Sequence, residues 1–380
     1  MFKDTVAFIR SIYQTDDFIP LHEPHFSDPE KKLVLECIDS TYVSSVGIFV
    51  DQFERDIEAY TGAKHAVAVV NGTQALYVAL QLAGVQSETE VITQSLSFIA
   101  TANAIHYTGA EPVFLDVDKD TLGLSPKSLQ IFLEQKTVQK EGKCWNKETG
   151  KEISACVPMH TFGHPCRIEE IAILCKKFNV ALVEDAAESL GSFVSSKHTG
   201  LFGKLGILSF NGNKIITTGA GGMIITNDKH LAKKAKHLTT TAKVPHPWEF
   251  IHDEIGYNFR MPNLNAALGV AQLDKLSRFV DKKRILAKKY KVFFKEKNVH
   301  FIKEPEDCKS NYWLNAVQLS NLEKRDLFLK ETNEQGVMTR AIWRPNHLLP
   351  MYQNCQTGKL DNTAFLYERI VNIPSSVLPE

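Results

Sequence analysis

The sequence has no excess of charge of either sign. Its 44 lysine and arginine residues balance 44 aspartate and glutamate residues, so the formal net charge is zero. This balance removes the usual electrostatic argument for a nucleic-acid or membrane-surface partner. We therefore expect neither partner, and any charged ligand must be held by local groups.

Long apolar runs and paired cysteines are also lacking. No apolar run approaches the roughly 20 residues of a membrane span. Residues 1–17 are predicted to form an amphipathic helix, in which Asp4 and Arg10 interrupt any signal-peptide core. The seven cysteines are odd in number and form no C-x-x-C pair, which argues against a disulfide framework. We expect a cytoplasmic protein that folds without disulfides or metal.

What the sequence does contain is a regular alternation of short apolar strands and helical patterns between residues 62 and 226. The expected strands are 65–70, 90–93, 112–117, 155–159, 180–184 and 206–210, and the expected helices are 73–82, 98–107 and 168–178. Strands alternating with helices predict a largely parallel α/β sheet covered on both faces. The active site of such a fold is expected at the carboxyl ends of the strands.

The length of 380 residues suggests one large and one smaller domain. We place the large domain at 1–270, including an N-terminal helical arm, and a small C-terminal α+β domain at 271–380. The polar insert at 136–153 interrupts the strand–helix rhythm and is predicted to be a hairpin, with a turn signal at Glu148-Thr149-Gly150.

Two polar motifs directly follow predicted strands. In Asn71-Gly72-Thr73 the backbone N–H groups and the Thr73 hydroxyl could bind a phosphate at a helix N-terminus, although an ordinary N-cap with a turn glycine explains the tripeptide better when it is taken alone. Asp185 ends a buried strand, where a carboxylate is costly without a partner. It could face a pyridine nitrogen, and a helix N-cap is an equally good explanation.

Lys214 follows the predicted strand 206–210 and precedes the glycine-rich stretch 218–222, which would let a cofactor approach the backbone. Most lysines are solvated surface groups. Lys214 therefore becomes informative only in combination with the other motifs.

Four motifs occur in a fixed order: Thr73 opening a helix, Phe98 in SFIATAN, Asp185 in EDAAE, and Ser209-Phe210-x-x-x-Lys214. This ordered set resembles the sugar aminotransferases of the DegT/DnrJ/EryC1/StrS family. The resemblance implies the fold type I of pyridoxal-phosphate-dependent transferases, with a large, mostly parallel seven-stranded α/β/α sheet domain and a smaller α+β domain. It also implies pyridoxal 5′-phosphate as cofactor.

The resemblance further implies a role for each matching residue. Lys214 and Asp185 would be catalytic, Lys214 holding the cofactor as a Schiff base and Asp185 pairing with the pyridine nitrogen. Further cofactor-binding residues would be Gly72, Thr73 and Ser209 at the phosphate, Phe98 on the ring, and His160 and Glu188 close by. Asn258 matches a residue that reaches the phosphate from the neighbouring subunit, so an active homodimer with shared sites is expected.

The substrate follows from finer features of the same resemblance. Glu188 stands where many members have Gln or His, as in perosamine synthases and in the aminotransferases of legionaminic acid biosynthesis. Segments 2–6, 136–153 and 159–165 look most like the latter group. The implied reaction moves an amino group from L-glutamate to C4 of UDP-4-keto-6-deoxy-N-acetylglucosamine, with ping-pong kinetics. A GDP-perosamine-type reaction is the alternative.

Other sites were weighed against simpler explanations. Trp248, Arg344 and His347 could contact a nucleotide sugar, although solvated turns explain them as well. Potential zinc ligands match no standard spacing; they are Cys156, His160, His164 and Cys166. Two competing functions remain, a 3-dehydratase, which would carry histidine in place of Lys214, and a non-catalytic regulatory protein, which would not need the full motif set.

Overall fold

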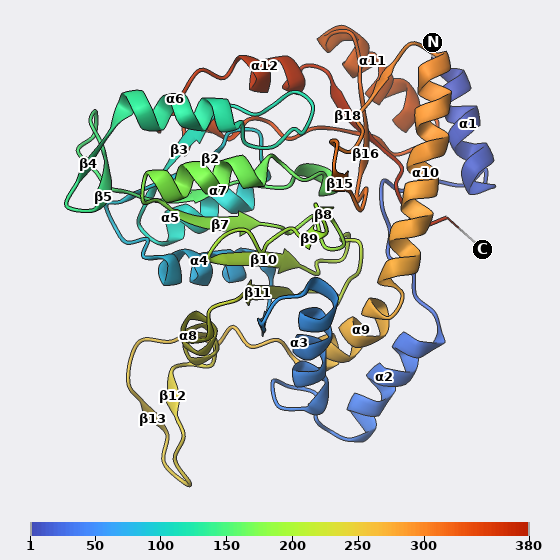
Figure 1. Ribbon diagram of the computed structural model, residues 1–380. Helices are drawn as coiled ribbons and strands as arrows, with labels where there is room; N and C mark the ends of the chain where they lie inside the picture. Colours follow the sequence, from blue (N-terminus) through green and yellow to red (C-terminus); the bar gives the residue numbers. More distant parts are fainter. Residues whose placement is uncertain (1, 379–380) are drawn as a thin grey trace.

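The computed structural model describes residues 2–378, and a seven-stranded sheet forms its centre (Figure 1). The strand order is β1-β11-β10-β7-β6-β2-β3. The strands are β1 (His65–Val69), β2 (Glu90–Gln94), β3 (Glu111–Leu115), β6 (Ile153–Val157), β7 (Ala181–Asp185), β10 (Leu205–Ser209) and β11 (Gly222–Thr226). Neighbours from β10 to β3 pair in parallel, whereas β11 is antiparallel to both β1 and β10. The predicted mostly parallel sheet is confirmed.

Helices cover both faces of this sheet. On one face lie α4 (Gly72–Ala83), α5 (Ile99–Tyr107) and α8 (Lys229–Thr239), and on the other lie α3 (Ile48–Thr61), α6 (Pro126–Lys136) and α7 (Ile168–Lys177). Successive strand residues enter different cores: Val183 of β7 packs in the core with α4, whereas Leu182 packs in the core with α7. Because both faces are buried, the strands are mostly apolar.

Two hairpins lie outside the central sheet, one after α6 and one after α8. The predicted hairpin in the insert is present as β4 (Thr137–Lys140) and β5 (Lys143–Asn146). The two strands are joined at Glu141-Gly142, where both residues adopt positive φ (55° and 72°), as a two-residue type I′ turn requires. The predicted turn at 148–150 is also present, and across it Trp145 bridges antiparallel to Glu152. The other hairpin, β12 (Lys243–Val244) and β13 (Ile251–His252), projects away from the body (Figure 1).

The C-terminal part contains a four-stranded antiparallel sheet in the order β14-β16-β18-β17. Its strands are β14 (His300–Phe301), β16 (Asn315–Gln318), β17 (Arg340–Ala341) and β18 (Ile370–Ile373). A three-stranded sheet joins β8 (Phe193–Val194), β9 (Lys197–His198) and β15 (Cys308–Lys309). The remaining helices are α1 (Lys3–Tyr13), α2 (Asp28–Asp39), α9 (Asn263–Leu273), α10 (Leu276–Glu296), α11 (Leu322–Glu334) and α12 (Asp361–Tyr367), with 3-10 turns η1 (Thr161–Gly163) and η2 (Asn346–Leu348).

The N-terminal helix α1 packs with these C-terminal elements. Val6 and Ile9 share a buried core with Leu286 and Tyr290 of α10. The domain boundary near residue 270 stays a prediction. Within residues 2–378 no helix is long and apolar enough to cross a bilayer, and all seven cysteines are free thiols.

Candidate active site

A cavity of about 430 Å³ opens at the carboxyl ends of the central strands, where the sequence predicted the active site. Seven of the predicted cofactor residues line it: Gly72, Thr73, Phe98, Asp185, Glu188, Ser209 and Lys214. The other side is closed by Leu21 in the segment before α2, by Trp313 just before β16, and by Arg340 and Asn372 of the C-terminal sheet.

The start of α4 and the end of β10 form a cradle for an anion. The Asn71 side chain caps α4 by accepting a hydrogen bond from the Gln74 N–H at 2.9 Å. A Cβ atom at Gly72 would lie only 2.9 Å from Cβ of Ser209, so glycine lets the two segments approach closely. The helix N-terminus and the hydroxyls of Thr73 and Ser209 therefore fit a phosphate group.

Asp185 is buried at the end of β7 and is fixed through both carboxylate oxygens. Its Oδ2 accepts a hydrogen bond from Oγ1 of Thr101 at 2.7 Å, and its Oδ1 accepts one from the Ala187 N–H at 3.2 Å. The capping bond to Ala187 shows that one carboxylate can cap a turn and still face the cavity. Thr101 lies in the SFIATAN motif, but its role was not predicted.

Lys214 meets a second buried carboxyl group. Its Nζ lies 3.4 Å from Oε1 of Glu188 and 4.0 Å from the centroid of the Trp313 ring. Burial raises the pKa of Glu188 to about 7, although the Lys214 ammonium acts to lower it. A carboxyl group with this pKa can hold or release a proton next to the lysine amine at neutral pH.

The position of Glu188 depends on an unusual backbone conformation at Phe162. This buried residue adopts φ 57° and ψ 17°, the left-handed region that bulky residues rarely occupy. Its N–H donates to Oε2 of Glu188 at 2.9 Å, while Nδ2 of Asn311 donates to the Glu188 carbonyl, also at 2.9 Å. The Phe162 N–H thus holds the carboxyl group through a backbone conformation that costs energy to maintain, while Asn311 fixes the backbone of Glu188.

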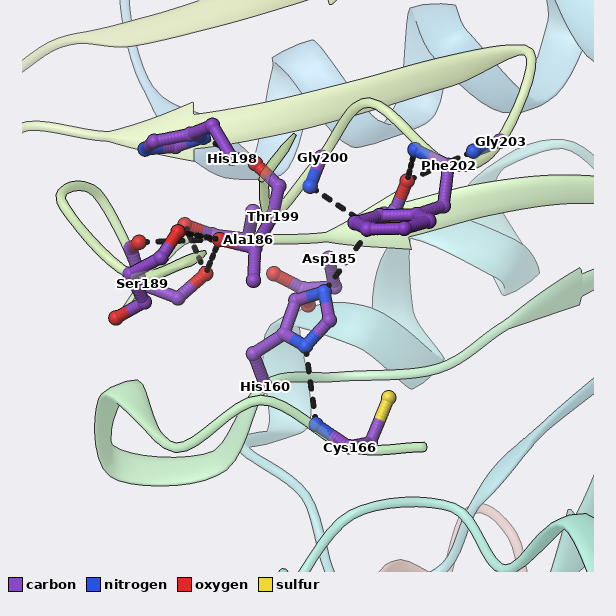
Figure 2. A network of polar contacts seen from close by, with 12 residues as sticks. His160, Cys166, Asp185, Ala186, Ser189, His198, Thr199, Gly200, Phe202 and Gly203 are labelled. Atoms are coloured by element: carbon purple, nitrogen blue, oxygen red, sulfur yellow. Dashed lines mark hydrogen bonds and ion pairs between the residues drawn. The ribbon is translucent and has the colours of Figure 1, made fainter. Parts of the chain in front are cut away.

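A buried polar network surrounds the strand end that carries Asp185 (Figure 2). Nδ1 of His160 accepts the Cys166 N–H at 3.3 Å, so Nε2 carries the proton and donates to Glu184 at 3.1 Å. The backbone N–H of His160 also donates to the backbone carbonyl of Asp185 at 3.2 Å. The Glu184 carboxylate accepts further hydrogen bonds from the N–H groups of Gly200, Phe202 and Gly203. His160 was predicted to contact the cofactor; it lies outside the cavity lining, because its side chain is engaged with Glu184.

Within residues 2–378, the potential zinc ligands noted in the sequence do not bring three ligand atoms together at one point. His164 pairs through Nδ1 with Oγ of Ser310 at 3.0 Å, and Cys156 packs in an apolar core. Across residues 2–378, three potential metal ligands converge only at the base of the β12–β13 hairpin, and Nζ of Lys234 contacts one of them; they are His237, Asp253 and Glu254.

The remaining predicted residues lie at the rim or outside the cavity. Phe98 is half exposed and meets Trp343 edge-on, with ring centroids 6.3 Å apart. Four others do not line the cavity: Trp248, which is 80% exposed on the β12–β13 hairpin, Asn258, Arg344 and His347. Oδ1 of Asn258 accepts from Arg260, and Nδ1 of His347 lies 2.7 Å from Oγ of Ser95.

Fold and cavity together define an α/β enzyme of the transferase class. The chain belongs to the DegT/DnrJ/EryC1/StrS aminotransferase family, which matches residues 25–378, and the resemblance predicted from the motifs is confirmed. It is 37% identical over 362 residues to the GDP-perosamine synthase of Escherichia coli O157:H7, covering 94% of this chain and 93% of that protein.

Two further relatives agree with this membership. EpsN of Bacillus subtilis, whose name assigns it to the pyridoxal phosphate-dependent aminotransferases, is 36% identical over 94% of this chain and 90% of its own. Helicobacter pylori PseC, an aminotransferase involved in the biosynthesis of pseudoaminic acid, superimposes with a TM-score of 0.85 at 25% identity, over 94% of each chain. Family and fold place the protein among the aminotransferases.

Proposed function

We propose that this protein is a cytoplasmic sugar aminotransferase that moves an amino group from L-glutamate to C4 of a nucleotide-linked 4-keto-6-deoxy sugar. One observation carries the proposal: the Lys214 amine lies 3.4 Å from the buried Glu188 carboxyl group, in the cavity that also contains Asp185 and the anion cradle. Membership of an aminotransferase family supports the reaction class.

The cofactor is pyridoxal 5′-phosphate, which supplies an electron sink for negative charge at the substrate carbon. The cavity fits it, because Gly72 lets the N-terminus of α4 lie close to Ser209 at the end of β10, and a helix N-terminus beside hydroxyl groups favours a phosphate. Gly72, Thr73 and Ser209 would hold that phosphate. Asp185 would face the ring nitrogen, and Phe98 would cover one ring face.

The chain's own residues supply the proton chemistry. The Lys214 amine would hold the cofactor and, once free, move a proton at the reacting carbon. Glu188 would exchange a proton with that amine, since its pKa of about 7 leaves both protonation states populated. Trp313 limits where the amine can move, because its ring lies 4.0 Å from Nζ.

Replacing Lys214 tests the proposal. Wild-type protein should bind pyridoxal phosphate with visible absorbance, and borohydride should fix the cofactor mass to the peptide that contains Lys214. Lys214→Ala should reduce turnover by about a thousandfold or more, because it removes the proton carrier. Lys214→Arg keeps the charge and should be as inactive. Wild-type protein that stays colourless and inert with added cofactor would overturn the proposal.

The nucleotide sugar has two candidates. The N-terminal segment, the insert and residues 159–165 favour UDP-4-keto-6-deoxy-N-acetylglucosamine, as in legionaminic acid biosynthesis. The identity of 37% to a protein named GDP-perosamine synthase favours a GDP-linked sugar without the acetamido group. Glutamate consumption with the two ketosugars side by side separates the candidates, and the preferred sugar is the one with the higher kcat/KM.

We also propose a homodimer in which each active site takes Asn258 from the partner. The position of Asn258 outside the cavity of its own chain supports this arrangement. So do the exposed apolar side chains of Trp248 and Phe250 on the projecting hairpin, 80% and 81% exposed.

Mixing two inactive variants tests the sharing of sites. A mixed dimer of Lys214→Ala and Asn258→Ala chains would contain one intact site if Asn258 acts across the interface. Random exchange should then restore about a quarter of wild-type activity. If Asn258 acts within its own chain, the mixture should stay inactive.

A further inference from the structure

Asn372 places an unused hydrogen-bond donor in the cavity wall. It belongs to β18, is 3% exposed and lines the cavity. Its Nδ2 is buried and has no hydrogen-bond partner within residues 2–378. Buried donors are nearly always paired in folded proteins, so an unpaired one that lines a substrate cavity indicates a ligand atom.

Arg340 lies directly beside this amide. Arg340 of β17 is the register partner of Asn372 in the antiparallel β17–β18 pair. Directly opposed residues project from the same face of a sheet, and both residues line the cavity. The Arg340 side chain is exposed, and its guanidinium has no hydrogen-bond or ion-pair partner in the described part of the chain.

The charges of the cavity lining favour a carboxylate ligand. Its acidic residues are Asp185 and Glu188, and its cationic residues are Lys214 and Arg340. Because Lys214 is required for the cofactor and the proton, Arg340 is the cation left for a substrate anion. A planar guanidinium beside an amide N–H presents donors in the geometry that a carboxylate accepts.

We propose that Arg340 and Asn372 bind a carboxylate of the amino donor. This inference rests on the proposed function, since it requires an amino-acid donor. The carbon that carries the donor's amino group also carries a carboxylate, so this anion must enter the cavity that contains Lys214. The diphosphate of a nucleotide sugar is separated from C4 by the sugar ring and therefore lies further from the reacting atoms.

Separate half-reactions test the assignment. Conversion of the loaded enzyme by glutamate alone, followed by absorbance, reports donor binding, and conversion of its amino form by the ketosugar alone reports acceptor binding. Arg340→Ala should weaken apparent glutamate affinity about 30-fold, the loss of a charged hydrogen-bonding partner, and change the sugar half-reaction less than about twofold. Asn372→Ala should weaken glutamate affinity about fivefold.

Two further variants sharpen the test. Asn372→Asp should weaken glutamate binding more than Asn372→Ala, because it places a negative charge beside the ligand. Lys330→Ala removes an exposed cation of α11, which packs on β17 and β18, and should leave both half-reactions unchanged. Calorimetric binding of 2-oxoglutarate should show the same order of variants without turnover.

The outcomes separate this inference from the proposed function. A wild-type protein that is inert towards glutamate overturns both. A reactive wild type with an equally reactive Arg340→Ala variant overturns only the carboxylate site. If Arg340→Ala loses reactivity only in the sugar half-reaction, the carboxylate site is also overturned and Arg340 is assigned to the diphosphate. If the variant loses reactivity equally in both half-reactions and binds the cofactor more weakly, Arg340 has only a structural role and the carboxylate site is overturned.

Discussion

Nζ of Lys214 lies 3.4 Å from Oε1 of Glu188, and the Glu188 side chain is only 2% exposed. A carboxyl group and an amine at this distance can pass a proton directly between them. Substitutions at Glu188 should therefore alter both the pH dependence of the enzyme and the pH dependence of its stability.

Glu188→Gln should remove a stability contribution that depends on pH. Burial raises the pKa of Glu188 from 4.5 to about 7, so the folded state binds an extra proton between these values. This group's contribution to the free energy of unfolding is fully present below pH 4.5. It is lost as the pH rises towards 7, at about 1.4 kcal/mol per pH unit. Urea unfolding of cofactor-free protein measures this loss. From pH 5 to pH 7.5, the free energy of unfolding of the wild type should fall by about 2–3 kcal/mol more than that of the variant. Parallel pH dependences would contradict the raised pKa.

Gly72→Ala should weaken cofactor binding without unfolding the protein. The new Cβ would lie 2.9 Å from Cβ of Ser209, so α4 and β10 must separate where the phosphate is expected. We expect an increase in the dissociation constant of pyridoxal phosphate of about tenfold, the loss of one good hydrogen bond. Gly212→Ala is the control, because a Cβ there meets nothing within 4 Å. Equal affinities of the two variants would argue against a phosphate at this position.

Glu184→Gln should destabilise the protein strongly. The carboxylate is fully buried and accepts hydrogen bonds from His160 and from backbone N–H groups, two of them at 2.8 and 2.7 Å from Gly200 and Gly203. An amide cannot accept all of them, and the expected loss is about 3 kcal/mol in the free energy of unfolding. Glu334→Gln, in an exposed pair with Lys330 at 4.0 Å, should change it by less than about 0.5 kcal/mol. A loss at position 184 as small as that of the control would rule out a supporting role.

Lys283→Met should flatten the rise of stability at alkaline pH. Lys283 is fully buried on α10, and its Nζ donates to the carbonyl oxygens of Trp313 and Ser375. Two acceptors match a neutral amine, and burial lowers the pKa of Lys283 from 10.5 to about 7.

Between pH 7 and 10.5 the unfolded state therefore binds one more proton at Lys283 than the folded state does. The contribution of Lys283 to the free energy of unfolding is fully present above pH 10.5 and is lost as the pH falls through 7. From pH 7 to pH 9, the free energy of unfolding of the wild type, measured with urea, should rise by about 2–3 kcal/mol more than that of the variant. Identical slopes would show that Lys283 stays charged in the folded protein.

The sequence could predict the strand-end half of the site. Gly72, Asp185 and Ser209 each lie at or just after the end of an apolar strand, and parallel strands bring such residues to one edge. Periodicity alone was sufficient to place these residues, and the ordered motifs then gave them chemical roles.

The other half of the site could not be predicted in this way. Arg340 and Asn372 lie on strands of two and four residues, too short for any periodic signal, and they meet only because β17 and β18 pair. Strand β11 was missed because it begins within the glycine-rich stretch, whose composition indicates a turn. The sequence indicated the turn at 148–150 of the insert but not the one at Glu141-Gly142, where the backbone twist of the flanking strands selects a two-residue loop.

The cavity takes Leu21 from near one end of the chain and Asn372 from near the other. Strand β18, which carries Asn372, pairs with both β16 and β17, so this one strand ties the C-terminal sheet together. A nascent chain can complete its central sheet and still lack one wall of the substrate cavity. A chain that ends before β18 would contain every strand of the central sheet but would lack Asn372 and the strand that holds Arg340 in register, the two residues proposed to bind the donor carboxylate.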